Sequence, residues 1–406
     1  MTNREISKKR ADELKAYSVS YLEAKKTLKY GLDEKNAARI QASKALIIKH
    51  LNVGDKEYED WRWQFKNRFT SFDKLDFYFS FSEHEKRRLE EITQKYRMAI
   101  TPYYLSLIDP ADPEDPIRRM ALASYDELDE TGFLDPMLEA QTNPCGLITR
   151  RYPDRLIINV TNACAMYCRH CQRRRKIGEI DKASAPKDIE DSINYIRENP
   201  EIRDVLITGG DPLTLPDYYL EKLIGSIRSI PHVEIIRIGS RMPVTLPQRI
   251  TPELVSILKK YHPFYINTQF NHPVEITEEA ARACDLLADN GIMSGNQMVL
   301  LDGVNNDPYV VRLLNQQLLR IRVRPYYIFH PKKVKGTQHF YVNIEDGLSI
   351  IDSLRGHTSG MAIPTYIINA PGGQGKVPLL PSYITSHKDN KYYIKNWEGK
   401  IIEYEE

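Results

Sequence analysis

The sequence predicts an α/β fold in which a parallel sheet follows a helical N-terminal extension. Three observations support this prediction. Short β-rich segments alternate with helical segments between residues 155 and 329, in six units of roughly thirty residues. The first 150 residues show helical periodicity instead, and the last residues alternate as a β-hairpin does. Six βα units could form an open doubly wound sheet or an incomplete barrel, and periodicity does not distinguish the two.

The predicted helical extension covers residues 1–150. Residues 7–32 and 82–98 have helical periodicity, with charged side chains on the exposed face. The run DPADPEDP at 109–116 interrupts this pattern, because each Pro disfavours a helical conformation in the residue before it. We therefore expect helices on both sides of a linker within this extension.

The predicted sheet lies within residues 151–335. Its strands are expected to begin at Arg155, Asp204, Val233, Phe264, Ile292 and Val323. Helical segments such as 188–199 and 277–290 separate them. In such a sheet the carboxyl ends of the strands carry the chemistry. The last segment, 336–406, is expected to hold a glycine-rich loop and a small β element, a hairpin around WEGK.

The composition is that of a soluble globular protein, with 41% hydrophobic and 28% charged residues. The net charge of +2 provides no strong field that would attract nucleic acid or an anionic membrane. No segment is long and apolar enough to span a bilayer, and the N-terminus has no signal-peptide pattern. We expect a cytoplasmic protein. An odd number of cysteines, 5, three of them clustered, also favours a reducing compartment and a metal site.

The clustered cysteines form the motif C-x3-C-x2-C directly after the first predicted barrel strand. Its members are Cys164, Cys168 and Cys171. A zinc site that includes His170 is one interpretation, but this spacing is unusual for zinc and no second cysteine pair exists. Cys145 and Cys284 stand alone and are expected to be buried apolar thiols. The favoured interpretation is a 4Fe–4S cluster on three thiolates, whose fourth iron is open for a ligand that takes part in chemistry.

A second chemical motif is NAPGGQGKVP at 369–378, a glycine-rich loop with one lysine. The loop could be a plain surface turn, and a phosphate-binding P-loop fits poorly because no Ser or Thr follows Lys376. A lysine with a lowered pKa can instead condense with an aldehyde, as lysines that bind pyridoxal phosphate do. Arg151 and Arg155, in RRYPDR, are suited to bidentate phosphate contacts, although they could also be ordinary surface charges.

The cysteine motif, with Tyr167 before its second cysteine, resembles that of the radical S-adenosylmethionine (SAM) enzymes. This resemblance implies a partial (βα)6 barrel, in which the open iron of the cluster binds SAM and the cofactors together generate a 5′-deoxyadenosyl radical. The segment TGGDPL, 208–213, is similar to the glycine-rich motif of that superfamily. By the same resemblance, SAM should contact Gly209, Gly210 and Asp211.

From about residue 60 nearly to the C-terminus, the chain resembles the pyridoxal-dependent aminomutases of the lysine 2,3-aminomutase type. The matching segments include RYPDR, MYCRHC, LITGGDPL, GSRMPVTLPQRIT, RVRPYY and APGG. The resemblance implies an isomerase, an intramolecular aminotransferase, in which Lys376 binds pyridoxal phosphate covalently. The other implied contacts are Arg151 and Arg155 with the cofactor and its phosphate, Tyr152 with the pyridoxal ring, Arg173 with the substrate's α-carboxylate, and Asn267, Gln269 and Gln297 with the cofactors.

The sequence departs from the lysine enzymes at the two aspartates that bind the distal ammonium group of lysine. Lys332 and Asn369 occupy these positions. A cation and an amide would repel an ammonium group but would bind a carboxylate. We therefore expect the 2,3-aminomutation of L-glutamate to β-glutamate (3-aminoglutarate). A lysine or arginine 2,3-aminomutase is the alternative.

The expected partners are an amino-acid substrate and an electron donor such as flavodoxin or ferredoxin. The cysteine-rich zinc segment of the lysine enzymes is absent from the sequence, so we expect no such zinc, but still a homo-oligomer. The run CQRRRK could be read as a nucleic-acid-binding patch, and the cysteines as a structural zinc site. The near-neutral net charge argues against nucleic acid, and we expect neither nucleic acid nor a membrane as a partner.

Overall fold

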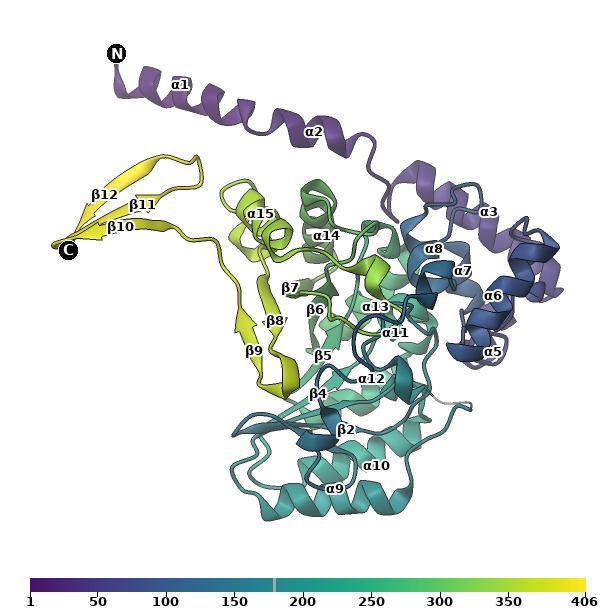
Figure 1. The fold of residues 1–406 in the computed structure, drawn as a ribbon. Coiled ribbons are helices and arrows are strands. Elements are labelled where there is room, and N and C mark those ends of the chain that lie inside the picture. The colour runs from purple at the N-terminus through teal and green to yellow at the C-terminus, as the bar shows by residue number, and fades with distance from the viewer. Residues whose placement is uncertain (178–179) are drawn as a thin grey trace.

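The computed structural model describes residues 1–177 and 180–406, and a nine-stranded sheet lies at its centre (Figure 1). The strands follow one another in chain order, so the sheet has no topological switch point. Strands β2 to β8 are parallel, and β1 and β9 are antiparallel to their neighbours. The strands are β1 (Ile148–Arg150), β2 (Arg155–Asn159), β3 (Asp204–Thr208), β4 (Ile235–Gly239), β5 (Phe264–Thr268), β6 (Met293–Val299), β7 (Val323–Phe329), β8 (Thr365–Asn369) and β9 (Lys376–Pro378).

The six predicted strands are β2 to β7 and their existence is confirmed, with β4 and β6 beginning slightly later than predicted. The sequential order decides between the two predicted forms in favour of the incomplete barrel. The strands are joined mainly through α9 (Pro186–Glu198), α10 (Asp217–Arg228), α11 (Met242–Thr245), α12 (Pro252–Leu258), α13 (Glu278–Asp289), α14 (Pro308–Arg320) and α15 (Ile344–Leu354).

Alternation along the strands separates the core from the site. In β2, Leu156 and Ile158 are buried in a hydrophobic cluster that includes residues of α9 and α10. The intervening Ile157 and Asn159 are only partly buried and line a cavity. Because side chains on a strand point alternately to opposite faces, one face of the sheet packs on helices and the other faces this cavity.

The N-terminal region is mostly helical, as predicted. The predicted segment 7–32 covers most of α1 and all of α2, 82–98 contains α6, and the proline-rich run follows α7 and ends at the first residue of α8. The helices are α1 (Asn3–Ala16), α2 (Val19–Lys25), α3 (Glu34–Leu51), α4 (Asp55–Tyr58), α5 (Trp61–Lys66), α6 (Glu83–Lys95), α7 (Pro102–Ser106) and α8 (Pro116–Ala121).

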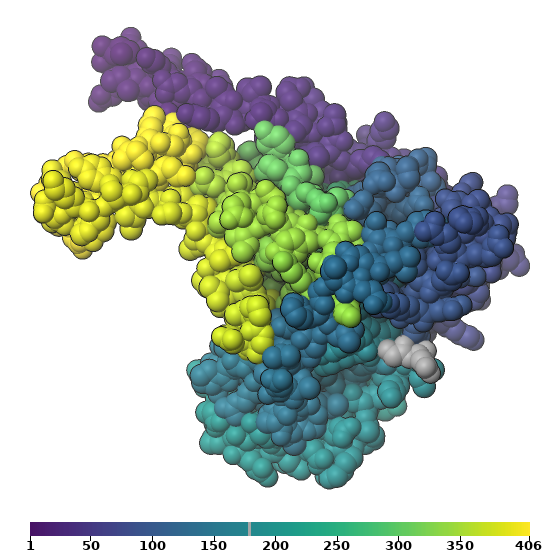
Figure 2. Space-filling view, in the orientation of Figure 1, coloured from purple at the N-terminus to yellow at the C-terminus, as the bar shows by residue number. Residues whose placement is uncertain are grey.

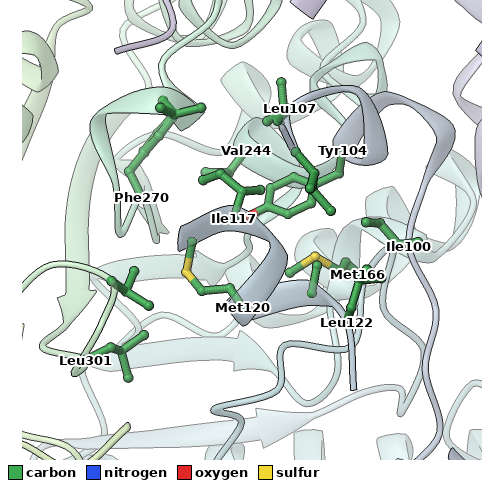
Figure 3. Close-up of a cluster of buried hydrophobic side chains, with 14 of the residues drawn as sticks. Ile100, Tyr104, Leu107, Ile117, Met120, Leu122, Met166, Val244, Phe270 and Leu301 are labelled. Carbon is green, nitrogen blue, oxygen red and sulfur yellow. The ribbon is translucent and has the colours of Figure 1, made fainter. Parts of the chain in front are cut away.

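Residues of α7 and α8 pack against the barrel in a second hydrophobic cluster (Figure 3). Tyr104 and Met120 share this cluster with Val244 of α11. Met166, which lies between the first two cysteines of the motif, belongs to it as well. The helical region therefore contributes to the packing that supports the cysteine loop.

The C-terminal segment has two parts. Strands β8 and β9 extend the central sheet, whereas β10 (Ile384–Lys388), β11 (Lys391–Lys395) and β12 (Ile401–Glu405) form a separate antiparallel sheet. The predicted hairpin is β11–β12, with β10 as a third strand. Figure 2 shows the N-terminal helices, in purple, running above this yellow sheet. In the described part of the chain, we find no helix with the length and apolar character that crossing a bilayer requires.

Candidate functional site

A cavity of about 830 Å³ lies at the carboxyl ends of the barrel strands. Every residue predicted for the site lines this cavity, so the structure brings them all together, while their individual roles stay predictions. These residues are Arg151, Tyr152, Arg155, Cys164, Cys168, Cys171, Arg173, Gly209, Gly210, Asp211, Asn267, Gln269, Gln297, Lys332, Asn369 and Lys376.

The cysteine loop follows β2, and its three thiols are partly buried. Arg241, in the segment after β4, donates from Nη1 to Cys168 Sγ at 2.8 Å. Among the described residues, no three His, Cys, Asp or Glu side chains form a group that could hold a single metal ion. The thiolates of an iron–sulfur cluster each bind a different iron, so they surround the cluster and need not converge on one point.

The other two cysteines lie outside the cavity. Cys284 is buried in the hydrophobic core, as predicted. Cys145 is only partly buried, and its thiol donates to the Asp191 carbonyl at a sulfur–oxygen distance of 3.6 Å. The prediction of a buried apolar thiol is therefore wrong for Cys145, because this short loop lies at the surface beside α9.

A buried ion-pair cluster fixes the shape of the cysteine loop. Glu127, which is fully buried, binds Arg169 Nε at 2.8 Å and also pairs with Arg174. Burial alone would raise the pKa of Glu127, but the two guanidinium groups lower it below its ordinary value. Sequence reasoning missed Glu127, because it lies far from the motif in the chain and in no pattern of its own.

The glycine-rich segment after β3 braces the start of the cysteine loop. Gly210 N donates to Thr161 O at 2.6 Å, and Asp211 N donates to Ala163 O at 2.7 Å. Gly209 has φ +129°, and a Cβ there would lie 2.4 Å from Thr161 O, so only glycine fits. The Asp211 carboxylate accepts hydrogen bonds from Ser240 Oγ at 3.0 Å and from Arg241 N at 2.8 Å. This segment therefore sets the position of the cysteine loop.

Lys376 lies at the start of β9, directly opposite Asn369 at the end of β8. Paired residues in an antiparallel ladder place their side chains on the same face. The Lys376 backbone N–H donates to Tyr152 Oη at 2.8 Å, and the Arg155 guanidinium carbon lies 3.8 Å from the Tyr152 ring centroid. Lys376 as a residue is exposed at the sheet edge, but its Nζ lies 4.9 Å from the Tyr327 ring centroid. Desolvation of this amine, with the nearby charges of Arg237 and Arg155, lowers the pKa of Lys376 to about 8. Part of its amine is therefore uncharged near neutral pH, as a nucleophilic amine must be.

The glycine-rich loop allows Arg151 and Tyr152, from the segment RRYPDR, to approach the β8–β9 turn closely. Gly373 has φ +77°, and a Cβ there would lie 3.0 Å from Arg151 Nε. Gly375 has φ +99°, and a Cβ there would lie 3.4 Å from the Tyr152 ring. Positive φ at both positions is readily adopted by glycine and rarely by other residues. The sequence APGGQG thus brings Arg151 and Tyr152 beside Lys376.

A cluster of positive charge lies beside this turn. Lys332, in the loop after β7, is partly buried, and its pKa is lowered to about 7 by burial and by Arg173, Arg151 and Lys376. Glu139 opposes this effect. Its carboxylate lies 2.8 Å from Arg173 Nε. Sequence reasoning missed Glu139, which begins a single short 3-10 turn without a recognisable motif.

The donor set fits the cofactors that the sequence predicts. Three thiols are the preferred ligands of an iron–sulfur cluster, and a lysine with two arginines suits an aldehyde that carries a phosphate. In the described residues, Arg151 Nε, Asn267 Nδ2 and His170 Nδ1 are buried without a hydrogen-bond partner, so the cavity wall has polar groups to spare for ligands. The cavity volume also lies near the upper end of the range for small-molecule sites.

Comparisons with known proteins agree with this geometry. Residues 158–313 match the family model described as the radical SAM superfamily, and 351–406 match that of lysine-2,3-aminomutase. The chain is 54% identical to the glutamate 2,3-aminomutase of Clostridioides difficile, over 99% of this chain and 95% of the relative. It is 49% identical to the L-lysine 2,3-aminomutase of Clostridium subterminale, over 87% and 86%. The chain therefore belongs to the lysine 2,3-aminomutase family of radical SAM enzymes.

Proposed function

We propose that this protein is an isomerase that moves the α-amino group of L-glutamate to C3, giving β-glutamate. The observation that carries the choice of glutamate is the cluster of cationic side chains around Lys332 in the cavity. Lys332 lines it beside Arg173 and Arg151, and Asn369 lines it beside Lys376. The identity with a relative named glutamate 2,3-aminomutase supports the same substrate.

The cofactors of this family are a 4Fe–4S cluster, SAM and pyridoxal phosphate. When bound, they supply a carbon radical that removes hydrogen from the substrate and a carrier for the migrating amino group. In our proposal the three clustered cysteines hold the cluster, and the TGGDP segment and the inward amides Asn267, Gln269 and Gln297 contact the cofactors. Lys376 holds the pyridoxal group, Tyr152 lies against its ring, and Arg151 and Arg155 bind its phosphate.

The protein's own charges then select and orient the substrate. Arg173 binds the α-carboxylate, Lys332 binds the distal carboxylate, and the Asn369 amide donates a second hydrogen bond. A charge-assisted hydrogen bond contributes about 1.5–3 kcal/mol. A lysine substrate would instead place its ammonium group against Lys332, and both charges would be poorly solvated. The two ends of the substrate thus fix C2 and C3 between them.

The test is an anaerobic assay of cofactor-loaded enzyme with glutamate, lysine and arginine side by side. We expect turnover of glutamate well above that of the other two. The double variant Lys332→Asp with Asn369→Asp should lose at least about a hundredfold in kcat/KM for glutamate, since two favourable contacts become repulsive. Lys333→Asp, at the adjacent exposed position, is the matched control and should stay within about twofold. Wild-type preference for lysine, or a double variant as active as wild type, would refute the proposal.

The remaining partners follow from this chemistry. The cluster must receive an electron at low potential, which favours a flavodoxin or a ferredoxin as donor. The three clustered cysteines, which are partly buried and form no disulfide, also favour a reducing, cytoplasmic environment. A homo-oligomer is supported by exposed apolar side chains on α1, α2 and β12, such as Leu14, Leu22, Ile402 and Tyr404. Sedimentation of the purified protein tests this assembly.

A further inference from the structure

Glu139 is a nearly buried acid surrounded by cations at the edge of the cavity. It begins the short 3-10 helix η3 (Glu139–Thr142), and its side chain is 4% exposed. Its carboxylate lies 2.8 Å from Arg173 Nε, 2.6 Å from Lys176 Nζ, 3.2 Å from Arg175 Nη2 and 3.9 Å from Arg151 Nη2.

The loop that carries Glu139 is fastened to the cofactor side of the cavity. Glu139 N donates to Asp135 Oδ2 at 2.8 Å, and Asp135 Oδ2 also pairs with Arg175 at 2.6 Å. Gly372 N, in the glycine-rich loop, donates to Pro136 O at 3.1 Å. Arg151 Nη2 donates to Met137 O at 3.3 Å. Glu139 is therefore held at a fixed place relative to Lys376 and the arginines.

We infer that Glu139 is a positioning residue, which holds the Arg173 guanidinium so that its two Nη groups receive the substrate's α-carboxylate. This inference rests on the proposed function. Arg173 lines the cavity and donates from Nε to Glu139, and neither Nη atom hydrogen-bonds to any residue that the structure describes. A carboxylate binds a guanidinium best through two parallel N–H groups. One edge of Arg173 is thus fixed by the protein, and the Nη pair remains for the ligand.

The charge of Glu139 is needed because the cations around it repel one another. Burial alone would raise the pKa of Glu139, but Arg173 and Lys176 lower it to about 2, so the carboxylate is ionised at any working pH. A neutral amide would keep the shape of the side chain but would neither pair with four cations nor fix the direction of Arg173. The opposite effect is conceivable on charge alone, since an anion next to Arg173 repels a substrate carboxylate. The sign of the measured change decides between these two roles.

The first experiment measures glutamate binding to the pyridoxal-loaded protein without SAM, so that no turnover occurs. Glu139→Gln should raise the dissociation constant by about tenfold or more, the effect of losing one charge-assisted hydrogen bond. In the complete assay, KM should rise more than kcat falls. Glu201→Gln is the matched control, because it removes a carboxylate 2.7 Å from Arg150 at the surface and away from the cavity. Its dissociation constant should match that of wild type.

The second experiment tests whether Glu139 acts through Arg173. Arg173→Ala should weaken binding strongly, and adding Glu139→Gln to it should cause less than about a threefold further loss, because coupled residues are not additive. Full additivity of the two changes would overturn the inference. So would unchanged or tighter binding in Glu139→Gln alone.

Two further arms keep the test conclusive. If Glu139→Gln does not fold, as judged by circular dichroism, Glu139→Asp retains the charge on a shorter side chain. It should bind glutamate roughly threefold to tenfold more weakly, and wild-type affinity would overturn the inference. The α-carboxylate is common to all α-amino acids, so Glu139→Gln should weaken binding of whichever amino acid wild type converts. A wild type that converts lysine would thus refute the glutamate proposal and still leave the role of Glu139 open to measurement.

Discussion

The protonation state of Lys332 depends on whether a ligand carboxylate is bound beside it. Burial and the neighbouring cations Arg173, Arg151 and Lys376 lower its pKa to about 7, against an ordinary value of 10.5. Above pH 7 the free protein therefore increasingly lacks the charge that the distal carboxylate of glutamate would need. A bound carboxylate raises the pKa of Lys332 again, so the substrate and a proton bind together.

This coupling gives a pH dependence with a definite sign. The dissociation constant of glutamate should rise as the pH increases above about 7, by up to about tenfold per pH unit, because Lys332 must take up a proton to bind. Titration of the pyridoxal-loaded protein with glutamate at several pH values measures this slope. In Lys332→Ala the affinity should be lower, and the slope that Lys332 causes should disappear. An unchanged slope in that variant would assign the pH dependence to another group.

At the scale of elements, the cysteine loop is a segment whose ligands are fixed by distant groups. Glu127 and Arg241 hold it from two sides, through Arg169 and through Cys168. We expect that replacing any one of Cys164, Cys168 or Cys171 with Ala removes most of the bound iron and all turnover. Cys145→Ser and Cys284→Ser are matched controls that should retain wild-type iron content. Iron and sulfide analysis of anaerobically reconstituted protein measures both groups of variants.

The β8–β9 ribbon provides a second test at the scale of structural elements. Lys376 has a lowered pKa and lies within 4.9 Å of the Tyr327 ring centroid, in the cavity. Reduction of the pyridoxal-loaded protein with borohydride should label Lys376 and no other lysine, as peptide mapping would show. Lys376→Ala should abolish the label and the activity. A pyridoxyl group on a different lysine would show that the ribbon does not hold the cofactor.

Elements and motifs were predictable from the sequence because their signals are local. Strands β2 to β5 are rich in β-branched or aromatic residues and lie between helical segments, the cysteine and glycine motifs follow β2 and β3, and the lysine motif follows β8. The glutamates at 127 and 139 were not predictable, since each acts on arginines about 35 to 50 positions away through loops without periodicity. The choice between barrel and open sheet also depended on strand order, which periodicity does not encode.

At the scale of the whole molecule, the two ends of the chain are joined. Trp397, in the turn between β11 and β12, lies 5.1 Å from the Tyr17 ring and 5.2 Å from the His357 ring, measured between centroids. Arg10 of α1 pairs with Glu398 at 2.8 Å. The contacts tie the N-terminal helix and the small sheet to the segment after α15.

We expect that this junction, between the arms formed by α1 and by β10 to β12, can be weakened without changing the binding of glutamate in the cavity. Trp397→Ala should destabilise the junction by about 1–3 kcal/mol, because Trp397 packs against Gly356 and two aromatic rings. Hydrogen exchange should then increase in α1 and in β10 to β12. Glutamate binding should stay within about twofold of wild type, since none of these residues lines the cavity. A large loss of glutamate affinity would show that the arms and the barrel are energetically coupled.

The pairing of Asn369 with Lys376 bears on how substrate specificity can evolve in this fold. The ladder that holds these two residues side by side is made of main-chain groups, which are the same whatever side chain stands at 369. A substitution at position 369 can therefore alter the contacts with the substrate, while the Lys376 amine keeps its position. Substrate specificity in such a family can therefore change by single substitutions at this position, while the catalytic lysine and its chemistry are retained.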